Sequence, residues 1–319
     1  MLHEFALSPD IFFPSAFGVR NENGEFIPAE NHGHLALSML WKGVIQFGVV
    51  RNLADGEWGN FLDLRQHELH VRSRETLKKL KIVGRIVDSA AQNGNSHSDE
   101  QSWLNEALAS HIANPRITQF FGTDEFCSSI NAADFQQLPK GVSKIPFCTP
   151  FSGRGCSIKV SRSIASYVST LMPLFKYSRS LMFIDPYLNL EAHNYQGFVQ
   201  LLKAVAATNP IAEIELHRQI TPSKGEVMKT SRDWHDSFDR VLSSDPALAS
   251  LRVNVFIWDE FHDRYLISNL MGISVPYGFD TSTKEDETRW TMLSAEDTDD
   301  VRNEFTDGDP MFRRTLIRP

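Results

Sequence analysis

The chain has 319 residues, of which 41% are hydrophobic and 11% aromatic, and its formal net charge is −8. This length and composition allow one large core or two moderate ones, and they exclude a disordered or fibrous protein. The negative net charge argues against a protein that coats nucleic acid over its whole surface, whereas a local basic face remains compatible with it.

The chain has three cysteines, Cys127, Cys148 and Cys156, and no two of them form a CxxC motif. They predict neither a disulfide framework nor a zinc knuckle. The first residues lack a basic stretch followed by an apolar one, and no apolar run approaches the roughly 18 residues that a membrane span needs. We therefore expect a protein of the reducing cytoplasm with no membrane span, no metal and no cofactor.

The first 155 residues predict a mainly helical region. Residues 35–50 are apolar on every face, which is typical of a buried core element. Further along the chain, Asp99 or Ser98 can cap a helix that carries Trp103.

Lysines and arginines gather between residues 65 and 85, where Leu77, Leu80 and Val83 recur at helical spacing. This pattern predicts a basic amphipathic helix. Two interpretations stay open, namely a solvated helix face and a face that binds a phosphate backbone or a protein partner. The residues that would contact nucleic acid in the second case are Arg72, Arg74, Lys78, Lys79, Lys81 and Arg85.

A domain boundary is predicted near residue 155. Prolines and glycines interrupt residues 136–157 and leave little periodicity there. The chain is therefore expected to divide into residues 1–155, which carry the basic helix, and residues 156–319.

The second half alternates strands and helices. The expected strands cover residues 180–184, 211–217, 251–258, 265–270 and 289–293. Because helical stripes separate the first three of these strands, we expect an α/β fold with a mainly parallel sheet and helices on both faces. The acidic run from 285 to 309 is expected to be a solvated tail or loop region.

Polar side chains follow several of these strands. Asp185 comes directly after one strand, His217 ends the next, and the cluster Glu260–Arg264 lies between residues 258 and 265. Because sites in open α/β sheets gather at the carboxyl ends of strands, these residues are the candidate site.

The sequence His-Asp-Arg at 262–264 is followed, after a strand-like run, by Gly-Phe-Asp at 278–280. This pattern resembles the single motif of the phospholipase D-like domains, most closely the variant in MIT C-terminal domains. The sequence FIDPYL at 183–188 is also similar to the first strand of bacterial phospholipase D-like proteins. The resemblance covers most of the chain. It implies a phospholipase D-like mixed, mainly parallel sheet and a genetic context of prokaryotic antiviral defence.

The resemblance also implies a metal-independent chemistry, in which one histidine attacks phosphorus and a second histidine acts as general acid. His262 matches the nucleophile. Arg264 stands where the family has lysine, and a guanidinium can still bind phosphate through two hydrogen bonds. Asn269 stands where an aspartate is expected, so Asp280 or Asp263 would have to pair with the imidazolium.

A second histidine would come either from the other chain of a homodimer or from His217. In the first functional interpretation, the chain is a phosphodiesterase or nuclease of a defence system. Its site residues would be His262, Arg264, Asp280, Asn269, His217 and Asp185.

In the second interpretation, the chain is a catalytically degenerate adaptor. It would bind phosphate groups, or a partner ATPase or nuclease from the same operon, and assemble a defence complex on nucleic acid. A purely structural alternative remains, in which Arg264 and Asp280 form an ion pair that holds the turn.

Overall fold

The structure is a computed structural model. It describes residues 2–16, 18–20, 23, 26–28, 30–94, 97–130, 139–148, 156–221, 229–248, 250–281, 286–307 and 312–316. The chain divides into two compact units, Leu2–Gly155 and Cys156–Pro319, and Met1 is grouped with the second. The composition predicts a boundary near residue 155, and residues 149–155 lie outside the described residues.

The N-terminal unit contains a five-stranded sheet. Its strands are β1 (His3–Leu7), β4 (Gly48–Asn52), β5 (Ile86–Asp88), β6 (Ile117–Gly122) and β7 (Lys140–Gly141). The spatial order is β5-β4-β1-β6-β7 and every pair is parallel. Counted within this sheet, the order is 3-2-1-4-5, which is a doubly wound topology.

The prediction of a mainly helical first half was therefore incomplete. The strands of this sheet have only two to six residues. Short strands that are buried on both faces lack the period-two alternation by which a sequence reveals a strand.

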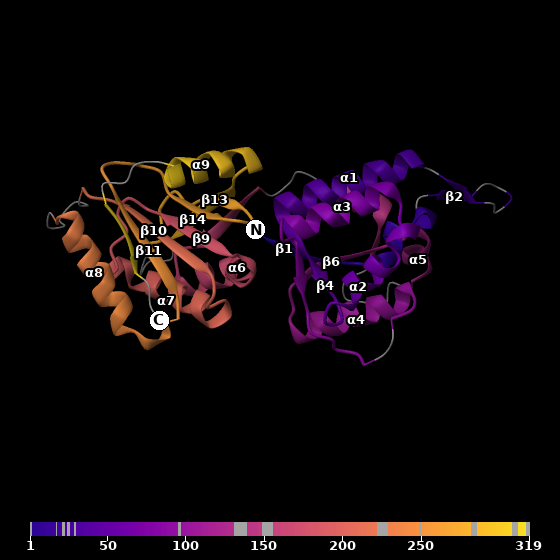
Figure 1. The fold of residues 1–319 in the computed structure, drawn as a ribbon, viewed down its shortest axis with the longest axis horizontal. Coiled ribbons are helices and arrows are strands. Elements are labelled where there is room, and N and C mark those ends of the chain that lie inside the picture. The colour runs from indigo at the N-terminus through magenta and orange to yellow at the C-terminus, as the bar shows by residue number, and fades with distance from the viewer. Residues whose placement is uncertain are drawn as a thin grey trace. The chain divides into compact units, whose positions relative to one another are not determined.

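Helices surround this sheet. They are α1 (Glu30–Phe47), α2 (Glu57–Leu64), α3 (Val71–Ile82), α4 (Glu100–Ala113) and α5 (Asp124–Ser129), and a small hairpin of β2 (Gly18–Arg20) and β3 (Phe26–Pro28) also belongs to this unit. The basic helix expected within residues 65–85 is α3, and Asp99 caps α4 by accepting from the backbone N–H of Ser102. Figure 1 shows α1 and α3 side by side.

A mixed eight-stranded sheet forms the C-terminal unit. Its spatial order is β15-β11-β10-β9-β12-β13-β14-β8. The strands are β8 (Ser157–Ser161), β9 (Ser180–Ile184), β10 (Glu213–Gln219), β11 (Arg252–Trp258), β12 (Tyr265–Ser268), β13 (Gly272–Ser274), β14 (Glu287–Met292) and β15 (Phe312–Leu316).

Only β9, β10 and β11 run parallel to one another, and every other described pair in this sheet is antiparallel. The expectation of a mainly parallel sheet in this half was therefore wrong, although a mixed α/β unit is present. The connection between β12 and β13 is short, and a short connection can join only antiparallel neighbours.

Helices lie on both faces of the C-terminal sheet. They are α6 (Ile164–Tyr177), α7 (Gln196–Thr208), α8 (Ser231–Ser244) and α9 (Ala295–Asp307). On one face, Phe183 packs edge-on against Phe198 of α7. On the other face, Met182 and Ile184 pack with Phe305 of α9, and Figure 1 shows α9 and α7 on opposite sides of the sheet. The acidic run expected to be a solvated tail or loop therefore includes a packed helix.

None of the helices in the described part of the chain is long and apolar enough to cross a membrane.

Candidate functional site

The candidate site lies where β9 ends and β12 begins. These two strands are antiparallel, and Tyr265 at the start of β12 pairs with Ile184 at the end of β9. The residue before Tyr265 and the residue after Ile184 therefore meet at the same sheet edge. They are Arg264 and Asp185, and Nε of the guanidinium lies 3.7 Å from Oδ1 of the carboxylate.

Asp185 is a fully buried carboxylate surrounded by donors. It accepts hydrogen bonds from the backbone N–H groups of Tyr187 (3.0 Å) and Phe279 (3.1 Å) and from the hydroxyl of Tyr195 (2.9 Å). Burial raises the pKa of the Asp185 carboxyl above its ordinary value, and these hydrogen bonds oppose that rise. Because its oxygens are so fully engaged, Asp185 supports Arg264 and is not itself an acid or base exposed to a substrate.

The turn at 276–279 depends on a glycine. Gly278 has a φ of 67°, in the left-handed region that favours glycine. A Cβ at this position would overlap Oδ2 of Asp185. The absence of a side chain at Gly278 therefore lets the N–H of Phe279 reach the buried carboxylate.

Arg264 is held on several sides and stays accessible. Its Nη1 donates to the carbonyl of Pro276 (3.2 Å), and its guanidinium lies 5.3 Å from the ring centroid of Tyr187. The side chain is 25% exposed, and Nη2 has no hydrogen-bond partner among the described residues. The guanidinium is thus positioned by the protein and retains donors for a ligand.

Asp280 pairs with another arginine. Its Oδ1 accepts from Nη2 of Arg162 at 2.7 Å, and the Arg162 guanidinium lies 5.0 Å from the ring centroid of Tyr277. The hypothesis of an Arg264–Asp280 ion pair is therefore wrong. The sequence missed Arg162 because it precedes Asp280 by 118 positions and follows β8, far from the recognisable motif.

His262 lies at the same edge as Arg264, in the loop between β11 and β12. Its side chain is 76% exposed, and Nε2 is 3.5 Å from an oxygen of Glu260, which is itself 69% exposed. The neighbouring Phe261 packs edge-on against Phe305 and thereby fixes the loop to α9. The chain therefore presents one accessible imidazole two residues from the anchored guanidinium.

His217 lies on the other face of the sheet. Its register partner on β9 is Ile184, which faces α9, whereas Asp185 is the next residue and faces the opposite side. The imidazole is fully buried, stacks on Phe256 at 4.4 Å and accepts from Nε1 of Trp258 at 3.0 Å.

Burial lowers the pKa of His217, so its imidazole is neutral around pH 7. Aromatic rings enclose this histidine, its Nε2 lies 3.4 Å from a carboxylate oxygen of Glu215, and the sheet separates it from Arg264. The expectation that it could serve as the second histidine of the site was wrong.

Asn269 lies at the far end of β12. Its Oδ1 accepts from the backbone N–H groups of Arg179 (2.7 Å) and Ser180 (3.4 Å), at the start of β9. A strand of four residues spans about 13 Å. Asn269 therefore connects two strands at the opposite edge of the sheet from Arg264, and its expected place in the site was also wrong.

The six basic residues predicted to bind nucleic acid differ in their surroundings. Arg85 is buried and donates to the carbonyls of Gly48 (3.0 Å) and Ile45 at the end of α1, and burial lowers its pKa to about 10. Its assignment to a binding surface was wrong, because its donors complete the end of a helix.

The other five lie on α3. Arg72 pairs with Glu75 at 2.8 Å, Lys81 pairs with Asp63 at 2.6 Å, and Lys79 lies over the ring of Trp41. Within the described part of the chain, the side chains of the remaining two, Arg74 and Lys78, have neither a hydrogen bond nor an ion pair.

A second polar edge, which the sequence did not reveal, lies at the carboxyl ends of β1 and β6. Burial raises the pKa of Asp10 and of Glu100, and Glu100 accepts from the backbone N–H of Thr123 at 2.9 Å. In a doubly wound sheet this edge is the topological switch point. The available signal was Asp10, which follows the buried strand β1 shortly, whereas Glu100 begins α4 and follows no buried strand. No group of three or more His, Cys, Asp or Glu side chains among the described residues could hold a metal ion.

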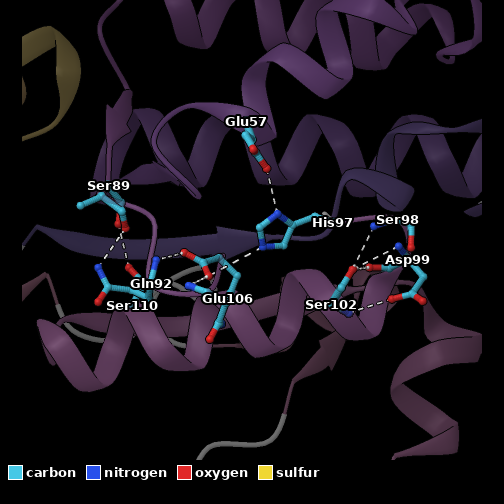
Figure 2. Close-up of polar contacts among 11 residues, drawn as sticks. Glu57, Ser89, Gln92, His97, Ser98, Asp99, Ser102, Glu106 and Ser110 are labelled. Atoms are coloured by element: carbon cyan, nitrogen blue, oxygen red, sulfur yellow. Dashed lines mark hydrogen bonds and ion pairs between the residues drawn. The ribbon is translucent and has the colours of Figure 1, made fainter. Parts of the chain in front are cut away.

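Figure 2 shows a further polar cluster on α4, centred on His97 and Glu106. Fully buried Glu106 accepts from the backbone N–H groups of Gln92 (2.8 Å) and Asn93 (2.9 Å). The ring of His97 stacks on Trp103 and lies 2.9 Å from a carboxylate oxygen of Glu57. These contacts hold Gln92, Asn93 and His97 against α4 and α2, which is a structural role.

Comparison with known proteins gives no family. No family model matches the chain. No curated protein matches it either. Among solved structures, an alignment pairs 86% of the chain with 91% of TrmBL2, an archaeal chromatin protein whose structure is described as showing a novel mode of DNA binding, at 12% identity and a TM-score of 0.28.

Proposed function

We propose that the C-terminal unit binds phosphate groups of nucleic acid at the edge formed by Arg264 and His262, and that one chain does this without cleaving the phosphodiester bond. The observation that carries this proposal is the state of Arg264. Its guanidinium is anchored on Asp185 and Pro276, is 25% exposed and keeps Nη2 unpartnered among the described residues. A fixed guanidinium with free donors suits the oxygens of a phosphate.

The geometry within one chain disfavours hydrolysis through two histidines. That chemistry needs a nucleophile and a general acid that both reach the reacting phosphate. His262 is accessible, but His217 is buried on the other face of the sheet. Asn269, which replaces the expected aspartate, lies at the far edge. These positions support the interpretation of a phosphate-binding adaptor.

The resemblance to phospholipase D-like proteins supplies the biological setting of the proposal. In that setting the chain is a component of a prokaryotic defence system, and it brings a partner ATPase or nuclease to nucleic acid. The binding site in the C-terminal unit would provide the contact with the phosphate backbone.

The test measures binding of labelled single-stranded and double-stranded DNA and RNA to the full chain in EDTA by fluorescence anisotropy. We expect Arg264→Ala to weaken binding about ten- to hundred-fold, because a hydrogen bond to a charged group contributes about 1.5–3 kcal/mol. The matched control is Arg252→Ala. Arg252 is 63% exposed and lies at the start of β11, whereas the loop that carries His262 follows the end of that strand. Equal losses of binding affinity in both variants would contradict the proposed binding site.

The same samples test the absence of turnover. We expect no cleavage of any of the nucleic acids during prolonged incubation. Cleavage in EDTA by wild type that His262→Ala abolishes would overturn the adaptor in favour of a nuclease, with the second histidine supplied by another chain.

A further inference from the structure

A hollow in the N-terminal unit lies between α2 and α3. It encloses about 130 Å³, and its apolar lining consists of Leu62, Leu69 and Leu77. A cavity of about 150 Å³ can hold a molecule the size of benzene. The hollow therefore has room for an apolar side chain.

Basic side chains surround the three leucines that line the hollow. Arg74, Lys78 and Lys81 line the hollow together with a single carboxylate, that of Asp63. Lys81 is paired with Asp63, but the side chains of Arg74 and Lys78 have no ion pair or hydrogen bond within the described residues. They follow each other at four-residue spacing on α3, so they project from one face of the helix. The hollow thus carries two unneutralised positive charges.

Exposed apolar side chains lie close in sequence to the residues that line the hollow. Leu64 is 81% exposed at the end of α2, Val71 is 56% exposed at the start of α3, and Ile82 is 68% exposed at the end of α3. Contacts with a nucleic acid backbone are strongly polar. Apolar side chains beside unpaired cations instead favour a protein segment that has carboxylates and an apolar anchor.

We propose that the hollow between α2 and α3 is a docking site for an acidic segment of a partner protein. An aliphatic or aromatic side chain of that segment enters between Leu62 and Leu77, and its neighbouring carboxylates pair with Arg74 and Lys78. The acidic helix α9 of a second copy lacks this combination, because its apolar residues Val301 and Phe305 already pack against their own sheet. The occupant is therefore a different protein.

The test uses the full chain and fluorescein-labelled peptides. One peptide carries a leucine between glutamates, and the second has serine in place of that leucine. A single-stranded oligonucleotide is the third probe. We expect the leucine peptide to bind at least tenfold more tightly than the serine peptide. Arg74→Glu and Lys78→Glu should each weaken its binding about tenfold.

The matched control is Lys144→Glu, which makes the same change of charge at an exposed lysine of the same unit and should leave peptide binding unchanged. Arg264→Ala should also leave it unchanged, which separates this proposal from the function proposed above. Failure of the leucine peptide to bind would overturn the docking site. Binding of the oligonucleotide alone, with losses in the Arg74 and Lys78 variants, would assign the surface to nucleic acid and overturn it equally.

Discussion

Two arginines of this molecule each face a buried carboxylate, and they differ in how much of their hydrogen-bonding capacity the protein uses. Arg51 in β4 is 2% exposed and donates to Glu4 in β1. It also donates to both the backbone carbonyl and the hydroxyl of Ser110 in α4. Arg264 is 25% exposed and leaves Nη2 unpartnered among the described residues.

The difference separates a structural ion pair from a candidate ligand site. Arg51 joins two strands to a helix, and its three guanidinium nitrogens all have partners inside the protein. The buried Asp185 instead fixes Arg264 from one side only. An arginine whose donors are all satisfied stabilises the fold, whereas one that is held and incompletely satisfied can recognise a ligand.

The largest effect is expected from breaking the structural pair. Arg51→Met should lower the free energy of unfolding of the N-terminal unit by about 3–5 kcal/mol, because it leaves Glu4 as an uncompensated buried charge. Urea denaturation followed by tryptophan fluorescence measures this, since Trp58 and Trp103 lie in that unit. The nucleic acid binding proposed for the C-terminal unit should persist at low urea.

The control for this prediction is the double variant Glu4→Gln with Arg51→Met, which removes both charges. It should recover part of the lost stability. If Arg51→Met alone cost less than about 1 kcal/mol, the assignment of this pair as structural would be contradicted.

A smaller effect is expected from disturbing the support of Arg264. Gly278→Ala places a side chain at a positive φ and against Oδ2 of Asp185. We expect a loss of about 1–3 kcal/mol of stability in the C-terminal unit, because a strained backbone position has a cost of this order. Binding of labelled DNA should weaken as well, since the displaced carboxylate no longer positions Arg264.

Gly94→Ala is the matched control, because no atom lies within 4 Å of a Cβ at Gly94. This exposed change should alter stability by less than about 0.5 kcal/mol. A Gly278→Ala variant that binds DNA like wild type would show that the position of Asp185 does not matter for recognition.

The sequence predicted the positions of the site residues better than their contacts. The strand at 180–184 and the strand beginning at Tyr265 are present, so Asp185 and Arg264 occupy the strand ends where they were expected. Their pairing depends on the antiparallel register of β9 and β12, which neither strand encodes alone.

The burial of His217 was not predicted, for a different reason. Polar and apolar residues alternate along β10, so the sequence assigned His217 to the face of the sheet opposite to that of Ile214 and Leu216. An acidic helix, α9, covers that polar-looking face, and only a few apolar residues such as Phe305 mark its packing side. The high charge of residues 295–307 therefore obscured their contact with the core.

The smallest effect is expected from the pH dependence of the buried His217. Because burial lowers the folded-state pKa of His217, the unfolded state binds a proton at this residue more readily than the folded state does. Its neutral form therefore favours folding at pH values above the ordinary pKa of about 6.5. This contribution is lost as the pH falls from there towards the lowered pKa.

His217→Phe removes the titrating group and leaves an aromatic ring against Phe256 and Phe305. We expect the variant to be less stable than wild type at pH 7, because Nε1 of Trp258 loses its acceptor. Its deficit should shrink as the pH is lowered below 6.5. Urea denaturation of wild type and the variant at several pH values measures this. A deficit for His217→Phe that stays constant with pH would mean that the folded and unfolded states bind the proton at His217 equally well, and it would contradict the lowered pKa of the buried imidazole.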